Sequence, residues 1–212
     1  MIFSRVKNLL GYKTQKGITL IESLVAIAIF VILMLVATGF IYAIYRAQGY
    51  SFEQSQAINE ARKGTEAMVK EIREAQAAQD GSYEIITTGE LEFSFYGDID
   101  KDSSIEKVRY FVEGTDFKKG VIEPTSVSQL GDMPPRYLPE NEHISILSRY
   151  VRNSAPIFRY FDGSGNELSA ASRKRDTKIM RLYLVINVNL DRPPNNFYLE
   201  SETQIRNLKS NL

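Results

Sequence analysis

The chain has 212 residues, and its 26 lysines and arginines balance its 26 aspartates and glutamates. It contains no cysteine and one histidine, which excludes a disulfide framework, thiolate chemistry and a multi-histidine metal site within one chain. The charge is unevenly distributed, because Arg5, Lys7, Lys13 and Lys16 all precede Gly17 with no acid among them. The rest of the chain is mildly acidic, so we expect no general nucleic-acid-binding surface.

A charge-free apolar run from Ser23 to Tyr45 follows the basic start. As a helix rising about 1.5 Å per residue, it can cross a hydrocarbon core of about 30 Å. The run is longer than the roughly 7–15 apolar residues of an ordinary signal peptide, so its length alone predicts a membrane anchor. Because the basic residues come first, we expect the N-terminus in the cytoplasm and the bulk of the chain outside.

The helix is predicted to continue beyond the membrane to about Gln79, before a stop signal at Asp80-Gly81-Ser82. Apolar and small residues recur along this part at steps of three and four. They are Ala57, Ile58, Ala61, Thr65, Met68, Ile72 and Ala75. We expect this stripe to pack under a C-terminal domain. Gly49 and Gly64 weaken the helix locally without ending it.

A β-rich domain is predicted from about Asp80 to Leu212, where short alternating runs are separated by turn residues. The predicted strands lie at 91–96, 108–112, 117–122, 144–151, 157–161, 179–188 and 197–205. Such strands favour a mainly antiparallel sheet with a cover on one face, and the amphipathic helix Gln54–Ala77 is the expected cover. The predicted fold is therefore α+β, in three segments: 1–17, 18–79 and 80–212.

The junction between the basic start and the apolar helix reads Lys16-Gly17-Ile18-Thr19-Leu20-Ile21-Glu22. It closely resembles the processing motif of type IV pilins and type II secretion pseudopilins. That motif has a basic leader ending in glycine, a cleavage point, four largely apolar residues, a glutamate and an apolar helix. The resemblance implies a pilin-like fold, with a long N-terminal helix packed on an antiparallel sheet domain. It also implies that a prepilin peptidase cuts between Gly17 and Ile18 and methylates the new Ile18 amine.

Glu22 lies at the edge of the apolar helix, where a carboxylate is costly in lipid and is a candidate for function. By the family resemblance, its partner is the N-terminal amine of a neighbouring subunit. An ion pair in low dielectric would offset the two desolvation costs and fix the subunit register. The alternative is that Glu22 merely sits among lipid headgroups, and its spacing from Gly17 and Ile18 favours the pairing role.

Within this family the chain is most similar to the larger minor pseudopilins of the J type. The similarity lies in residues 59–64, 68–73, 95–100, 108–110 and 203–209. It implies a tip-complex subunit anchored in the inner membrane, with its C-terminal domain periplasmic or extracellular. The implied partners are other pseudopilin subunits, an assembly platform protein and an assembly ATPase. A minor pilin of a type IV pilus or DNA-uptake system shares nearly every feature, and an unprocessed membrane-anchored binding protein is a further alternative.

Acidic residues alternate at Asp98, Asp100 and Asp102, with Glu106 further on. This superficially resembles a calcium loop, but an EF-hand needs glycine at its sixth position and an acid at its twelfth. Those positions hold Ser103 and Arg109, which excludes an EF-hand. The ordinary interpretation is a solvated hairpin turn, and a looser calcium site is the alternative. We expect no other cofactor.

Catalysis is not expected of this chain. A Ser–His–acid triad would have to use His143, and no residue pattern around it marks a nucleophile. The run Asp162-Gly163-Ser164-Gly165-Asn166 has the composition of a tight turn and lacks the ending of a phosphate-binding loop.

Overall fold

The computed structural model describes residues 17–78, 80–125, 135–154, 156–192 and 195–205. Most of the predicted basic leader and the end of the segment 203–209 therefore lie outside the described residues. The chain divides into two compact units, residues 1–48 and 49–212.

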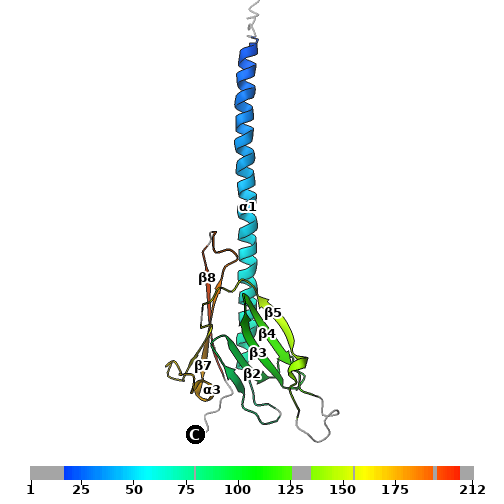
Figure 1. Ribbon diagram of the computed structural model, residues 1–212, viewed down its shortest axis with the longest axis vertical. Coiled ribbons are helices and arrows are strands. Elements are labelled where there is room, and N and C mark those ends of the chain that lie inside the picture. Colours follow the sequence, from blue (N-terminus) through cyan, green and yellow to red (C-terminus); the bar gives the residue numbers. More distant parts are fainter. Residues whose placement is uncertain (1–16, 79, 126–134, 155, 193–194, 206–212) are drawn as a thin grey trace, which may run out of the picture. The chain divides into compact units, whose positions relative to one another are not determined.

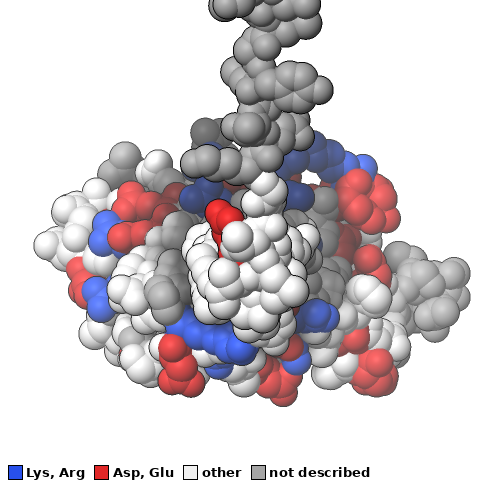
Figure 2. Space-filling view, turned by 90° about the horizontal axis from the view of Figure 1, so that it is seen from above, with Lys and Arg blue, Asp and Glu red and all other residues white. Residues whose placement is uncertain are grey.

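The first unit, where described, consists almost entirely of the N-terminal part of α1 (Leu20–Arg73), shown in blue in Figure 1. Every residue of α1 up to Gln48 is exposed, which confirms that its apolar side chains face outward on all sides. Seen from its N-terminal end in Figure 2, this helix is mostly white, the colour of residues without a charge. By length and composition α1 can cross a membrane, as the sequence predicts.

The second unit contains two antiparallel sheets. The larger has the strand order β1-β2-β3-β4-β5, with β1 at Ile85–Thr88, β2 at Glu92–Gly97, β3 at Glu106–Glu113, β4 at Asp116–Ile122 and β5 at His143–Ser148. The smaller has the order β6-β7-β8, with β6 at Phe158–Phe161, β7 at Ile179–Ile186 and β8 at Phe197–Gln204. A 3-10 turn, η1 (Pro139–Asn141), precedes β5, and a one-turn helix, α3 (Arg173–Asp176), precedes β7.

Seven of these strands fall where alternation predicts them, and the antiparallel α+β class is confirmed. β1 is not predicted, because it has four residues and a register irregularity between Ile85 and Thr87 that breaks the alternation. β5 ends at Ser148, earlier than predicted, and Val151 forms only an isolated bridge to Ile186.

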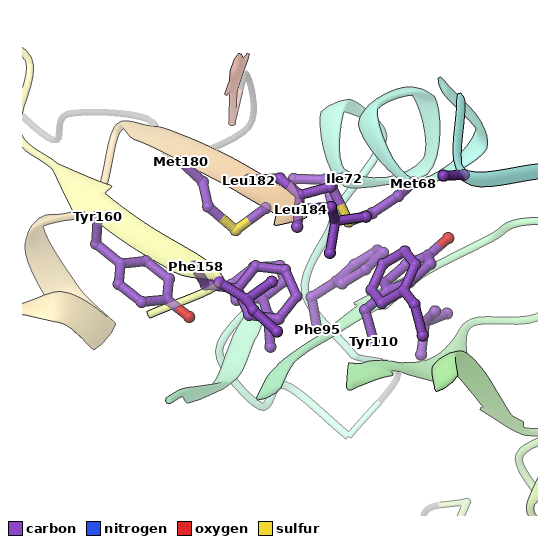
Figure 3. Close-up of a cluster of buried hydrophobic side chains, with 14 of the residues drawn as sticks. Met68, Ile72, Phe95, Tyr110, Phe158, Tyr160, Met180, Leu182 and Leu184 are labelled. Atoms are coloured by element: carbon purple, nitrogen blue, oxygen red, sulfur yellow. The ribbon is translucent and has the colours of Figure 1, made fainter. Parts of the chain in front are cut away.

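One hydrophobic core joins α1 to both sheets. The predicted stripe is confirmed, since Ala57, Ala61, Thr65, Met68 and Ile72 are all buried. In Figure 3, Met68 and Ile72 of α1 lie above aromatic rings of the larger sheet and beside aliphatic side chains of the smaller one. Full burial of such a side chain stabilises the fold by about 1.5–3 kcal/mol, which is why this part of α1 belongs to the second unit.

The C-terminal end of α1 comes earlier than the stop predicted at Asp80-Gly81-Ser82. The helix ends at Arg73, and the Gln76 N–H donates to the Tyr96 carbonyl at 2.9 Å. The chain thus leaves the helix to bond with β2, a tertiary contact that local stop signals do not record.

A buried glutamine ties α1 to the end of β7. Gln54 is 3% exposed, its Nε2 donates to the Ile186 carbonyl at 3.3 Å and its Oε1 accepts from the Val188 N–H at 2.9 Å. One side chain thereby satisfies a donor and an acceptor where the strand ladder stops. Its spacing from Ala57 and Ala61 puts Gln54 on the buried stripe, although its amide side chain alone does not indicate this contact.

Candidate functional site

The predicted cleavage junction lies immediately before α1. Gly17, Ile18 and Thr19 are not helical, and the Thr19 carbonyl accepts the first helical bond from the Ser23 N–H at 3.1 Å. The Thr19 Oγ1 accepts from the Glu22 N–H at 3.3 Å. Thr19 is therefore the N-cap of α1, and a threonine there satisfies a backbone donor that has no partner within the helix.

The cap could have been found in the sequence. Thr19 and Glu22 stand three residues apart in the order typical of a capping box at a helix start. Because the helix begins at Leu20, the Gly17–Ile18 peptide bond lies in non-helical backbone.

Glu22 occupies the first turn of α1, where the positive end of the helix dipole favours a carboxylate. It is exposed, and the surface beside it is a shallow apolar hollow lined by Ile21, Val25, Ala26 and Ile29. The helix terminus thus stabilises the Glu22 carboxylate, whereas the apolar residues around it would leave this carboxylate poorly solvated in a membrane.

The acidic residues between β2 and β3 do come together. Asp98, Asp100, Asp102 and Glu106 each place one carboxylate oxygen within 4.8 Å of the others. Glu106 is the first residue of β3 and pairs with Gly97, the last residue of β2, so the hairpin closes the loop around the cluster.

Backbone N–H groups of the same loop donate to the three aspartates. The contacts are Lys101 to Asp98 at 2.7 Å, Ser103 to Asp98 at 3.2 Å, Asp102 to Asp100 at 3.2 Å and Ser104 to Asp102 at 2.6 Å. Ser103, at the sixth position, has a φ of 73°, the left-handed conformation for which an EF-hand uses glycine. The loop thus curls as a calcium loop does at that position, although its residues exclude an EF-hand.

Glu106 has a different environment from the aspartates. Its side chain is buried, Oε2 accepts from the Ile99 N–H at 2.8 Å, and Oε1 is buried without a hydrogen-bond partner. Burial raises the pKa of Glu106 to about 7 against the lowering effect of the Ile99 bond, and repulsion from Glu123, Asp100 and Asp102 adds to the rise. Its two-residue spacing from Val108 and Tyr110 puts Glu106 on the buried face of β3, although an acidic residue is rarely buried there.

Two other acids of this unit, by contrast, meet cations. Glu71 accepts from the Tyr110 hydroxyl at 2.5 Å and from Lys119 Nζ at 2.7 Å. Glu142 accepts two bonds from the Arg109 guanidinium, at 2.8 and 2.7 Å. These contacts satisfy the carboxylates in the way expected of structural ion pairs.

The residues considered for catalysis do not form a site in the described part of the chain. His143 begins the edge strand β5, its side chain is exposed, and no described serine or acid forms a hydrogen bond to it. The predicted turn at Asp162 is present, since its carboxylate accepts from the Ser164 and Asn166 N–H groups at 2.8 and 2.9 Å.

Residues 12–38 match the family model described as the prokaryotic N-terminal methylation motif. No curated protein matches the chain. The matched segment contains the Gly17–Ile18 junction, the Thr19 cap, Glu22 and the first part of the apolar helix, and it ends before the residues that carry the J-type similarity. This motif marks type IV pilins and pseudopilins, so the N-terminal segment of the chain has the methylation motif of that family.

Proposed function

We propose that this pilin-like structural subunit is a minor, J-type pseudopilin that works in the tip complex of a type II secretion filament. The observation that carries the filament role is the methylation motif with the helix start directly after its cleavage junction. The minor, J-type assignment rests on the sequence similarity in residues 59–64, 68–73, 95–100, 108–110 and 203–209. A minor pilin of a type IV pilus or DNA-uptake system is the alternative within the same family.

Processing is the first step of the proposed role. A membrane prepilin peptidase cuts between Gly17 and Ile18 and methylates the Ile18 amine. Glycine before the bond and a capped helix after it support this step, because the peptide bond to be cut is free of helical hydrogen bonds. Cleavage removes the four basic residues of the leader and leaves the new amine beside the positive end of the α1 dipole.

The exposed apolar helix supports storage in the inner membrane followed by transfer to a filament. Its side chains need cover from lipid or from other apolar helices, since a surface of this size does not stay in water. In the filament, Glu22 of one subunit pairs with the Ile18 amine of its neighbour. The Ile18 amine is positively charged and lies at the positive end of the dipole of its own α1 helix, which repels it. The Glu22 carboxylate of the neighbouring subunit would compensate this repulsion. An assembly platform protein and an ATPase move the subunit between the two environments.

Mass spectrometry of the N-terminus, in protein purified from the native host, tests the proposal. The expected result is loss of residues 1–17 with a methyl group on Ile18. An intact Met1–Gly17 leader would instead identify the chain as an unprocessed membrane-anchored protein. Co-purification with other minor pseudopilins, compared with co-purification with pilus subunits, distinguishes the secretion system from the alternative.

A further inference from the structure

We propose that the loop between β2 and β3 is a calcium site whose carboxylate ligands are Asp98, Asp100, Asp102 and Glu106. One oxygen of each residue lies within 4.8 Å of the other three. Calcium binds oxygen at about 2.3–2.6 Å, so ligands on opposite sides of one ion are about 5 Å apart. The four oxygens therefore fit a single ion, and this site is separate from the N-terminal features that support the filament role.

The burial of Glu106 distinguishes this cluster from an ordinary acidic turn, whose side chains are solvated. Glu106 is 0% exposed, its Oε1 has no hydrogen-bond partner, and one oxygen of this carboxylate lies within 4.8 Å of the aspartate oxygens. A buried carboxylate oxygen without a partner is costly, and proteins compensate such groups with a cation or a proton. Glu71 and Glu142 of the same unit have their cations, whereas the groups acting on Glu106 include three further acids.

The hydrogen bonds inside the loop orient the aspartates without neutralising them. The donors are backbone N–H groups, which carry no net charge. An ionised carboxylate has about four acceptor positions, so each aspartate keeps free lone pairs for a metal. A divalent cation would therefore add ligands to a loop that is already folded around its position.

The donor set selects the kind of metal. All four ligands are carboxylate oxygens, and the chain has no cysteine and one histidine, so a hard cation is favoured over zinc or copper. Calcium accepts irregular shells of six to eight oxygens and completes them with water, whereas magnesium requires near-octahedral geometry at about 2.0–2.1 Å. An irregular loop with two exposed aspartates, one half-buried aspartate and one buried glutamate suits calcium.

Calorimetric titration of the full-length protein in detergent, after removal of metals with a chelator, tests this proposal. We expect one calcium ion per chain, with a Kd of about 10⁻⁴–10⁻³ M, as in extracellular modules. Calcium should raise the Tm by several degrees, and magnesium at the same concentration should raise it much less. Calcium binding should weaken at least about tenfold in Glu106→Gln and in Asp100→Asn, each of which removes one charged ligand.

Asp162→Asn is the matched control, because Asp162 also accepts backbone N–H groups in a turn but lies outside the cluster. It should bind calcium like the unchanged protein. The proposal is overturned if the unchanged protein shows no saturable calcium binding, if magnesium binds equally well, or if Asp162→Asn weakens binding as much as Asp100→Asn. Should Glu106→Gln fail to fold, the exposed Asp100 decides the question, since its replacement leaves the buried part of the hairpin intact.

Discussion

Gly64 of α1 lies against Leu147 of β5, and its replacement by alanine tests the packing of the two elements. A Cβ added at Gly64 would lie 2.8 Å from the Cβ of Leu147, and 3.6 Å from both its Cδ1 and its carbonyl oxygen. Since the nearest atom is a Cβ, it cannot turn away by changing rotamer, so the strand or the helix must shift. Gly49, in the same helix, has no atom within 4 Å of an added Cβ and provides the matched control.

Two opposing effects set the change in the free energy of unfolding. Alanine in place of glycine in a helix interior stabilises by about 1 kcal/mol, at either position. Overpacking of a close contact costs about 1–3 kcal/mol, and this applies only at Gly64. We therefore expect Gly49→Ala to stabilise the second unit by about 1 kcal/mol and Gly64→Ala to destabilise it by about 1 kcal/mol. For a domain of about 150–250 residues, the two variants should differ in Tm by roughly 4–8 °C.

Near-UV circular dichroism during heating measures this difference in the full-length protein in detergent. The chain has 12 tyrosines and no tryptophan, so the signal reports tyrosine packing. A Tm for Gly64→Ala equal to or above that of the unchanged protein would refute the reasoning. So would an equal rise in both variants, because helix propensity alone would then explain them.

Two further predictions concern the N-terminal motif. Glu22→Ala should be cleaved normally but incorporated poorly into filaments, measured by the share of protein in sheared filament fractions, and normal incorporation would rule out the charge pair. Thr19→Val should lose the helix cap, at a cost of about 1 kcal/mol, whereas Thr19→Ser should keep it. Hydrogen exchange at the Glu22 amide in micelles measures this loss, and equal protection in both variants would show that Thr19 does not cap the helix.

Much of the fold follows from periodicity. The buried stripe of α1 is predictable because its members recur at three- and four-residue steps, and the longer strands alternate with the two-residue period of a sheet. β1 and the end of α1 are not predictable in this way. The end of α1 depends on the bond between Gln76 and Tyr96 of β2, which no local stop signal records. β1 has only four residues and pairs with its neighbour β2 in an irregular register, so it shows no alternation.

The candidate sites also differ in how far the sequence alone predicts them. The cleavage junction and Glu22 belong to a contiguous motif, so their relation can be read directly from the sequence. The aspartates of the β2–β3 loop are also contiguous, but the burial of Glu106 depends on how the hairpin packs. Acidic residues at the start of a strand are usually exposed, so composition favours the solvated turn.

The two parts of α1 show how one helix can serve two different partners. Up to Gln48 the exposed positions carry large apolar side chains, whereas the part in the second unit buries small residues, such as Ala57 and Ala61, together with larger ones, such as Met68. Small residues allow a sheet to approach the helix, and large ones give area to lipid or to neighbouring helices. The described core begins at Ala57, so it includes no residue of the first unit. Substitutions such as Glu22→Ala should therefore leave the Tm of the second unit unchanged, and any loss of filament incorporation would report assembly instead of folding.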